Sequence, residues 1–389
     1  MKTTPPEALL LGSGVTVLGA LRCLAGVGIS ARVVSEEPFP YRRSRWYRPA
    51  PPFVVGGLPE YLHSLSADVA VLIPCSDRWV GEVAGLPQEL KDRFPSSVPP
   101  LAAINRLLDK GLFSQLLEDE GVPHPRTFVV DGASDVGQFD RLDRFFVKPR
   151  NSQLFQQHFG VKAFFPDSAE GLAEKLELAR RADLEVMLQE YVPGPASNHY
   201  FVDGFMDAEG QIRAIFARRR LRMHPPHFGN SSYMVSIPVA QAQQAVDNLT
   251  RLLRAARYRG IFSAEFKKDQ RDEVFKILEI NARPWWFVEF AANCGVNVVE
   301  MAHRDALGHP VDEVREYRVG KYFIHPYYDI SACLRESPSR ARGLITFLRS
   351  LPGADRPVLR WDDPLPALSE FSALTRGFVR RRLRGASSP

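Results

Sequence analysis

The sequence GIFSAEFKKDQRDEVFKILEINARPWW, residues 260–286, contains two strand-like segments on either side of the polar run DQRDE. Because residues of a strand alternate between its two faces, a hairpin that pairs Asp269 with Phe275 would set Glu265 directly opposite Glu279. Apolar residues lie beside both acids, which indicates that the strands are half-buried. This stretch therefore predicts a hairpin that brings two carboxylates together.

Two facing carboxylates need a positive partner. Like charges directly opposite each other across a ladder are destabilising, and a bound divalent cation reverses that cost. Mg²⁺ prefers carboxylate and amide oxygens, completed by phosphate oxygens. Asn281 shares a face with Glu279 and can add a neutral oxygen, while Arg283 can stabilise negative charge on a transferring phosphoryl or acyl group. The pattern predicts a magnesium site, although a solvated hairpin with ordinary surface charges also fits this stretch taken alone.

The spacing E-x(13)-E-x-N-x-R resembles the magnesium-binding end of the ATP-grasp superfamily. The resemblance implies that Glu265, Glu279 and Asn281 hold magnesium on the phosphates of ATP, and that Arg283 lies beside the reacting carboxylate. It also implies the fold class: an α/β N-terminal domain that is Rossmann-like, then two α+β subdomains that clamp ATP. The resemblance covers roughly residues 8–310, and its strength is the order of several motifs that are individually weak.

Motifs upstream of the hairpin follow the order typical of that superfamily. Lys110, in LLDKGLFSQLLEDEGVPHP, resembles its first ATP-contacting lysine, and Lys148, in FFVKPR, resembles the lysine that reaches the phosphates and adenine N7. The run MLQEYVPG resembles the hinge that clamps adenine, whose extended backbone supplies one donor and one acceptor. The hinge residues predicted to contact ATP are Gln189, Glu190, Tyr191 and Val192. Taken without the order of the other motifs, Lys110 is typical of a solvated charge on a helix, and Lys148 is typical of a residue at the end of a strand.

The stretch ARRRLRMHPPHFGNSS resembles the phosphate-side strand of one subgroup, carboligases similar to D-aspartate ligase, in which Arg220 and Arg222 would touch phosphates. An exposed sheet edge protected by arginine is the alternative. Two features depart from the superfamily pattern. The phosphate-covering loop RNSQLFQQHFG is poor in the glycines that let backbone amides approach phosphates. The acid that usually holds the ribose hydroxyls is missing, with Asn198 as the nearest candidate.

The chain has 389 residues, of which 45% are hydrophobic and 24% charged, and this favours a globular protein of two or three domains. Residues 1–100 show a β-turn-α-β opening and are predicted to form a small α/β domain that ends in the linker-like FPSSVPP. We expect the ATP-grasp domain in residues 101–310, with a lid subdomain at about 120–190, and a C-terminal extension in residues 311–389. A single helix is predicted over NRLLDKGLFSQLLEDEG.

The composition also indicates what the protein is not. No apolar run approaches the length needed to span a bilayer, and the short polar N-terminus does not resemble a secretory signal. The four cysteines show no C-x-x-C spacing, which favours a reducing, cytoplasmic setting. A net charge of +5 suits an anionic small molecule and does not indicate nucleic acid. Whether the chain forms a homodimer stays open.

The resemblance implies an ATP-dependent, magnesium-requiring ligase that activates a carboxylate as an acyl phosphate and joins it to an amine. Both substrates would be small molecules, with amino-acid ligation as the nearest analogy. Arg283, with Arg220 or Arg222, would stabilise the anionic transition state. Ser76 and Asp77 follow an apolar strand and are predicted to contact a substrate, with a helix cap as the alternative.

Two other functions fit parts of the sequence. The glycine-poor loop fits a non-catalytic or degenerate nucleotide-binding protein with the same fold. The segment GSGVTVLGAL, residues 12–21, together with Glu36, suggests a nicotinamide-dependent dehydrogenase. However, Val17 occupies the third glycine position of the dinucleotide fingerprint, so this signal is weak.

Overall fold

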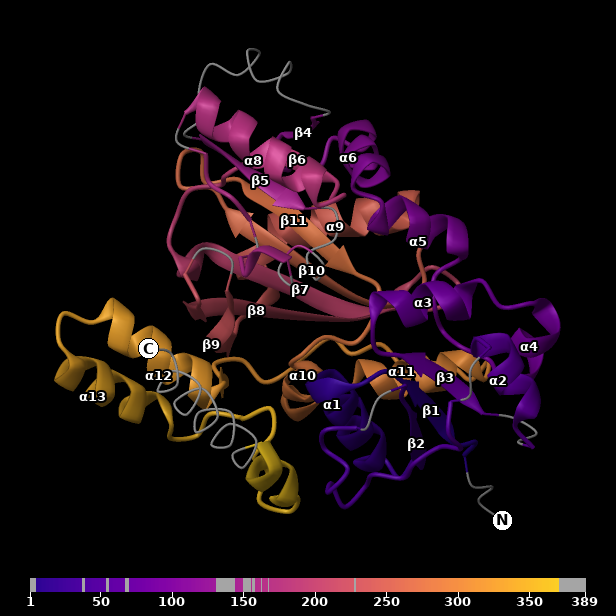
Figure 1. Ribbon diagram of the computed structural model, residues 1–389. Helices are drawn as coiled ribbons and strands as arrows, with labels where there is room; N and C mark the ends of the chain where they lie inside the picture. Colours follow the sequence, from indigo (N-terminus) through magenta and orange to yellow (C-terminus); the bar gives the residue numbers. More distant parts are fainter. Residues whose placement is uncertain are drawn as a thin grey trace, which may run out of the picture.

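The computed structural model describes residues 5–36, 39–53, 56–66, 70–130, 144–149, 155, 158–161, 163–166, 168–226 and 229–370 (Figure 1). Within these residues, the named strands form a parallel sheet of three strands, an antiparallel sheet of six and an antiparallel sheet of three. No helix in the described ranges is long and apolar enough to cross a membrane.

The parallel sheet has the order β2-β1-β3, with β1 at Ala8–Leu11, β2 at Ala31–Val34 and β3 at Val71–Pro74. Its helices are α1 (Gly14–Ala25), α2 (Leu58–Ser64), α3 (Asp77–Ala84) and α4 (Gln88–Arg93). Both β1 and β3 are buried throughout, as expected for parallel strands covered on two faces. Helices α1 and α3 begin just after β1 and β3, so their N-termini lie at the carboxyl edge, where such sheets bind ligands.

Two helices follow where the sequence predicts one. They are α5 (Leu101–Leu108) and α6 (Lys110–Asp119). Asp109 separates them in an extended conformation, and its carboxylate accepts hydrogen bonds from the N–H groups of Gly111 and Leu112, both at 2.9 Å. The single-helix prediction is therefore wrong, because an N-cap aspartate starts a new helix in the middle of the apolar pattern.

A small antiparallel sheet has the order β4-β6-β5, with β4 at Thr127–Val129, β5 at Phe145–Pro149 and β6 at Val186–Glu190. Helix α8 (Ala169–Arg181) packs on it, and Leu172 and Leu176 join strand residues in a separate apolar cluster. The segment that connects β6 to the next strand contains the short helix η3 (Ala196–Asn198).

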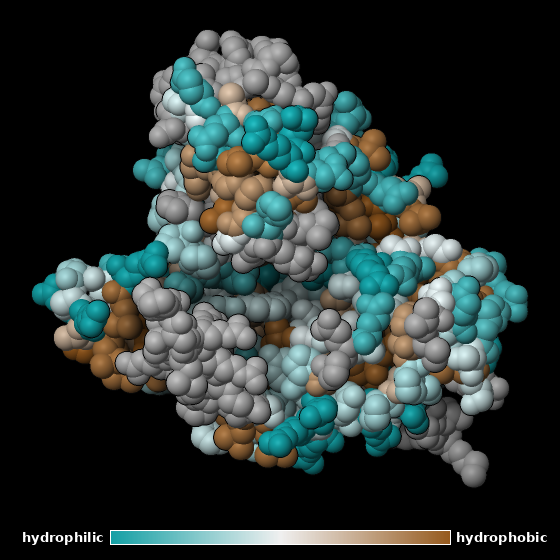
Figure 2. All heavy atoms as spheres, viewed as in Figure 1, coloured by the Kyte–Doolittle hydropathy of each residue, from teal (hydrophilic) through white to brown (hydrophobic). Residues whose placement is uncertain are grey.

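The six-stranded sheet has the order β11-β10-β7-β8-β9-β12. The strands are β7 (His199–Met206), β8 (Ile212–His224), β9 (Asn230–Ser236), β10 (Gly260–Lys268), β11 (Phe275–Asn281) and β12 (Tyr322–Ile324). Its helices are η4 (Val239–Ala242), α9 (Gln243–Ala255), α10 (Val288–Cys294) and α11 (Val298–Ala306). One buried cluster contains residues of β1, α1, α10, α11 and this sheet, which fixes the parallel sheet against it. Figure 2 shows the molecular face hollowed between the lobe of the two antiparallel sheets and the lobe of the parallel sheet.

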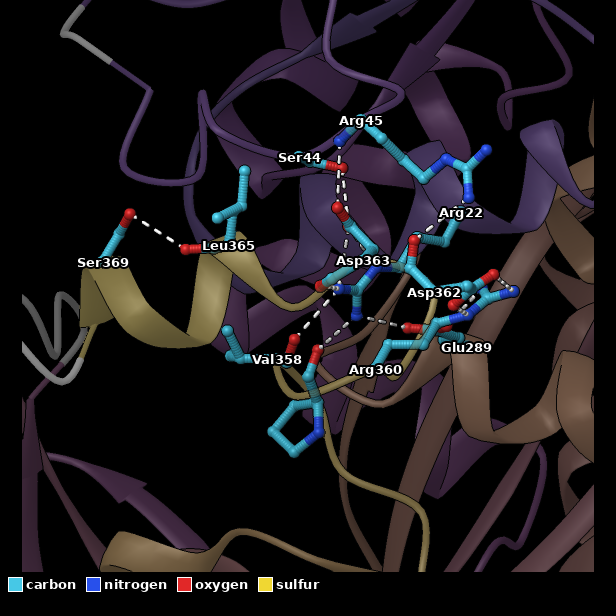
Figure 3. A network of polar contacts seen from close by, with 11 residues as sticks. Arg22, Ser44, Arg45, Glu289, Val358, Arg360, Asp362, Asp363, Leu365 and Ser369 are labelled. Carbon is cyan, nitrogen blue, oxygen red and sulfur yellow. Dashed lines mark hydrogen bonds and ion pairs between the residues drawn. The ribbon is translucent and has the colours of Figure 1, made fainter.

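The last described part contains α12 (Pro326–Glu336) and α13 (Arg340–Ser350), followed by a segment that returns to the parallel sheet. This return depends on Arg22 of α1, whose guanidinium is fully buried and contacts carboxylates of Asp363 at 3.0 Å and Glu289 at 3.2 Å (Figure 3). Asp363 also accepts hydrogen bonds from Ser44 and from the N–H of Arg45. A buried charge network thus joins α1, α10 and the end of the described chain.

Candidate active site

The β10–β11 hairpin sets Glu265 opposite Glu279, as the sequence predicts. The predicted register at the turn is wrong, because Phe275 pairs with Lys268 and not with Asp269. A β-bulge between Glu265 and the next residue shifts the register by one, which restores the pairing of the two acids. Such bulges re-aim side chains next to functional sites.

The carboxylate of Glu265 already has positive neighbours. Its Oε1 lies 2.6 Å from Nδ1 of His199 and 3.2 Å from Nη2 of Arg220. Burial alone would raise the pKa of Glu265, but Arg220 and His199 lower that pKa to about 2. Glu265 is therefore an anion. A bound metal ion is not the sole means of offsetting the charges of the two facing acids, since the guanidinium of Arg220 offsets one of them.

Oxygens suited to a hard cation remain at this pair. Within the described part of the chain, neither Glu265 Oε2 nor the exposed carboxylate of Glu279 accepts a hydrogen bond. Asn281 Oδ1 accepts only from Arg283, at 3.1 Å, among those residues. The described residues contain no group of three or more His, Cys, Asp or Glu that could hold a metal. Two carboxylates and one amide therefore fit Mg²⁺, which takes few protein ligands and completes its shell with substrate phosphates and water.

The three-stranded sheet β4-β6-β5 falls within the predicted lid and is called the lid sheet below. A cavity of about 350 Å³ lies between it and the six-stranded sheet. The predicted hinge residues Gln189, Glu190, Tyr191 and Val192 line this cavity. Lys148, Arg220, Glu265 and Glu279 line the same cavity. Lys148 on β5 donates to Gln189 Oε1 at 3.2 Å, and burial lowers its pKa. The structure thus brings the predicted hinge, strand lysine and acids to one cavity.

Among the last three residues of the predicted hinge, one backbone N–H lacks a backbone acceptor in the described part of the chain. The N–H of Glu190 bonds to the carbonyl of Arg126 at 2.8 Å, and that of Tyr191 bonds to the carbonyl of Arg144 at 2.6 Å. In contrast, the N–H of Val192 has no backbone acceptor in the described ranges. The side chain of Glu190 is a structural group, because it accepts from Arg271 at 2.7 Å. A planar ligand at this hinge would therefore be read by Val192 N–H and by neighbouring carbonyls.

A larger cavity, of about 870 Å³, adjoins the first and shares Lys148, Leu278 and Glu279 with it. One wall comes from β11 and the residues after it, including Asn281 and Arg283. The other wall comes from the carboxyl edge of the parallel sheet, where the N-termini of α1 and α3 lie. A group at Glu279 is therefore accessible from both cavities.

Arg283 connects the two walls of the larger cavity. Its Nε and Nη2 donate to the two carboxylate oxygens of Asp77 at 2.8 and 3.1 Å. Ser76 is the N-cap of α3 and accepts from the N–H of Trp79 at 3.4 Å, so the helix-cap alternative describes its present contact. Both Ser76 and Asp77 line the cavity, and Asp77 serves as the counter-ion of Arg283.

Arg222 is not brought to either cavity. Its Nε and Nη2 donate to the two oxygens of Asp329, at 2.9 and 2.7 Å, and it also bonds to Ser350. The reason is a register irregularity between Arg220 and Arg222, which adds a residue to β8 and interrupts the alternation of faces. The prediction that Arg222 acts in catalysis is therefore corrected to a structural ion pair with α12.

Three other sequence-level expectations have different outcomes. Asn198 donates to the carbonyl of Lys268 at 2.9 Å and does not line the 350 Å³ cavity, so nothing places it at a ribose. Lys110 begins α6, and its side chain lies outside the described residues, as does most of the loop at 150–160. Glu36 is engaged by Arg78 through two hydrogen bonds of 2.6 and 2.8 Å, which opposes the dehydrogenase alternative.

Sequence reasoning missed two residues of the 350 Å³ cavity. His199 is buried beside Glu265, and burial lowers its pKa. Lys267 is 4% exposed, has no hydrogen bond or ion pair in the described part, and places its Nζ 4.6 Å from the ring centroid of Tyr191. Burial lowers the pKa of Lys267 to about 8. Strand alternation could have found it, since Lys267 lies two residues after Glu265 on the same face.

The chain is similar to known ligases in sequence and in fold. D-aspartate ligase of Enterococcus faecium (strain Aus0004) is 25% identical over 245 residues, which are 60% of this chain and 58% of that protein. The chain thus matches less than two thirds of this relative's length. The L-amino acid ligase of Bacillus licheniformis has a TM-score of 0.62 and 13% identity, covering 82% of this chain and 79% of that one.

A third relative was solved with nucleotide. The biotin carboxylase domain of Hydrogenobacter thermophilus 2-oxoglutarate carboxylase, in complex with MgADP, ADP and bicarbonate, has a TM-score of 0.61 and 15% identity, covering 81% of this chain and 73% of that one.

Residues 183–322, which include the β10–β11 hairpin, match the family described as ATP-grasp in the biosynthetic pathway with Ter operon. The chain therefore has the ATP-grasp fold and contains an ATP-grasp domain.

Proposed function

We propose that the chain is an ATP-dependent ligase that activates a carboxylate as an acyl phosphate and joins it to an amine, with release of ADP and phosphate. The observation that carries this proposal is the pair of adjoining cavities that share Lys148 and Glu279. One has the hinge of a nucleotide site, and the other has room for further small molecules. A reaction between a nucleotide phosphate and a second substrate requires such a junction.

The relatives support the same proposal. Two of them are named as ligases of amino acids, and a third was solved with MgADP and bicarbonate, a carboxylate-like anion. We therefore propose ATP and Mg²⁺ for this chain, with a small-molecule carboxylate and amine as substrates. Glu265, Glu279 and Asn281 would hold the Mg²⁺, which supplies positive charge for the phosphates when bound.

The side chains at the junction have distinct roles in this proposal. Val192 N–H orients the base, while Lys148 and Arg220 donate to phosphate oxygens. Arg220 is suited to this because its Nη1 bonds to no acceptor in the described residues, while Nε and Nη2 are held by Ser231 and Glu265. Arg283 binds the reacting carboxylate and stabilises its developing charge.

The proposed chemistry has two steps. A carboxylate oxygen bonds to the γ-phosphorus of ATP while the bond from that phosphorus to the β,γ-bridging oxygen breaks, which releases ADP. The amine nitrogen then bonds to the acyl carbon, the carbon–oxygen bond to phosphate breaks, and the nitrogen gives up a proton as phosphate leaves. Enclosure of the junction would keep water from the acyl phosphate between these steps.

The proposal is tested by ADP release from the full chain with ATP, MgCl₂ and pairwise mixtures of D- and L-amino acids. We expect at least one pair to give ADP and a coupled product, with no release when EDTA removes the metal. If every pair gives no more ADP than the Glu279→Gln variant, the ligase proposal is wrong.

Lys267 gives an independent check on the nucleotide end. A buried ammonium that makes no hydrogen bond or ion pair with a described residue is suited to donate to an oxygen of the bound nucleotide. Lys267→Met keeps the length of the side chain, so we expect the KM for ATP to rise about tenfold or more. The matched control is Lys268→Met, because Lys268 pairs with exposed Glu273 and does not line the cavity. Equal KM values for the two variants would contradict the assignment.

A further inference from the structure

The helical hairpin formed by α12 and α13 projects from the side of the molecule (Figure 1). Helix α13 packs chiefly on α12, and no residue of either helix lines the 350 Å³ or the 870 Å³ cavity. Gly343 allows the two helices to approach closely, because a Cβ at this position would lie 2.7 Å from the carbonyl oxygen of Cys333. Away from this contact, most residues of α13 are exposed.

The exposed side of α13 carries an apolar stripe, which consists of Leu344, Ile345 and Leu348. These side chains are 45%, 49% and 52% exposed. At about 100° per residue, they lie together on the side of the helix away from Gly343. Figure 2 shows hydrophobic residues gathered on this hairpin, at the left of the view. Neighbouring aliphatic side chains that remain in water indicate a surface that contacts another molecule.

Arginines border the apolar stripe on both sides. On the same helical projection, Arg340 lies on one side of the stripe, and Arg342 and Arg349 lie on the other. All three are exposed, and their side chains make no hydrogen bond or ion pair with any residue in the described ranges. Within residues 326–350, all of which the structure describes, Glu336 is the one exposed acid. The apolar stripe therefore lies in positive surroundings.

The sequence adds positive charge after the described part of the chain. Residues 371–389 contain no Asp or Glu, and their five arginines are Arg376, Arg380, Arg381, Arg382 and Arg384. The side chains of this segment thus carry a formal charge of +5, which equals the net charge of the whole chain. Such an excess of positive charge favours an anionic partner.

The combination of the stripe and its arginines indicates the kind of partner. A second copy of the chain would set this face against itself, and arginines would then lie opposite arginines. Nucleic acid would engage the arginines but not the stripe, because bases are bound by stacking and hydrogen bonds. An anionic bilayer suits both groups, since aliphatic side chains enter the boundary between headgroups and acyl chains while arginines reach the headgroups.

We propose that the apolar stripe of α13, with Arg340, Arg342 and Arg349, binds the surface of a bilayer that contains anionic lipids. Helix α13 has eleven residues, which is too short to cross the hydrocarbon region, so it lies in the plane of the surface. The proposal does not depend on the ligase proposal, because the hairpin lines neither cavity.

Flotation of the full chain with lipid vesicles tests this proposal. The vesicles contain phosphatidylcholine alone, or phosphatidylcholine with about 30 mol% of the anionic lipid phosphatidylglycerol. We expect partition into the anionic vesicles to be higher by about tenfold or more at low salt, and to fall as salt screens the charges. Ile345→Ser/Leu348→Ser should lower that partition by about tenfold or more, because two aliphatic side chains no longer leave water.

A matched double substitution controls for lost hydrophobicity. Leu112 and Val319 lie outside the hairpin and are 50% and 49% exposed, close to the values for Leu348 and Ile345. Leu112→Ser/Val319→Ser should therefore bind vesicles as the wild type does. Thermal unfolding midpoints check that each variant is folded.

The role of charge is tested in the same way. Arg342→Gln/Arg349→Gln should lower partition into anionic vesicles by about tenfold. Arg254→Gln/Arg257→Gln removes the same charge from exposed positions at the end of α9, and should lower it by no more than about twofold. Equal losses in the two variants would mean that net charge, and not the face of α13, attracts the chain to the vesicles, which overturns the proposal.

Other outcomes also contradict the proposal. Absence of binding to anionic vesicles at low salt overturns it, and so does equal binding by Ile345→Ser/Leu348→Ser and the wild type. Self-association in sedimentation that the same substitution removes, without vesicle binding, would mean that the stripe is a contact between copies of the chain. Magnesium-dependent ADP release by Ile345→Ser/Leu348→Ser should equal that of the wild type, so failure of this proposal is distinguishable from failure of the ligase proposal.

Discussion

Glu279→Gln is expected to lower magnesium-dependent ADP release by about 100- to 1,000-fold, the range seen when one preorganised electrostatic group is removed from an active site. The carboxylate of Glu279 is exposed, and it makes no hydrogen bond with a described residue. Its loss therefore breaks no contact that holds the hairpin. It removes one of the two carboxylates of the proposed Mg²⁺ site, whose third protein ligand is the amide of Asn281. The effect should appear in kcat and in the magnesium concentration for half-maximal rate.

The hairpin provides a matched control for this substitution. Glu273 lies at the turn of the same hairpin, is largely exposed, and pairs with Lys268 at the surface. Glu273→Gln also removes one negative charge, but exposed ion pairs contribute little, so ADP release should stay within about twofold of the wild type. Equal losses in the two variants would mean that charge on the hairpin, and not a metal at Glu279, explains the effect.

Arg22→Met is expected to lower the free energy of unfolding by about 3–5 kcal/mol. Arg22 is buried, and its guanidinium donates to Asp363 and Glu289 and to the carbonyls of Pro357 and Val358 (Figure 3). Methionine fills much of the space, but it removes the guanidinium that pairs with the buried carboxylate of Asp363, while Glu289 keeps its ion pair with Arg360. An uncompensated buried charge is what makes the loss of one partner costly.

Urea denaturation followed by tryptophan fluorescence measures the change, and Arg32→Met is its control. Arg32 pairs with Glu7 at 2.7 Å, but the two side chains are 45% and 30% exposed, so we expect a loss of no more than about 1 kcal/mol. If Arg22→Met unfolds at the same urea concentration as Arg32→Met, the buried network does not hold α1 to the end of the described chain.

Local pattern was enough to predict the facing of Glu265 and Glu279, because strand alternation and a short turn leave few registers. The register itself was wrong by one residue, since a bulge has no reliable signal in a single sequence. The same limit explains Arg222. It lies two residues after Arg220, and simple alternation puts both on one face, but an irregularity in β8 turns Arg222 to Asp329.

Contacts between distant segments could not be predicted from local pattern. Nothing near Asp77 in the sequence indicates that it pairs with Arg283, which lies 206 residues later and just after β11. Likewise, Lys267 could be placed on the face of Glu265, but its proximity to Tyr191 depends on how the lid sheet packs. The family resemblance supplied the hinge and the acids, and the packing of the sheets supplied the second wall of the larger cavity.

The contact between Arg22 and Asp363 also bears on how the protein is made. These residues are 341 positions apart, so a ribosome that adds about 5–20 residues per second needs roughly 20–70 s between them. Until then the guanidinium on the first helix has no Asp363 to pair with. The parallel sheet can be synthesised early, but α1 gains its buried ion pair only after Asp363 has been added to the chain.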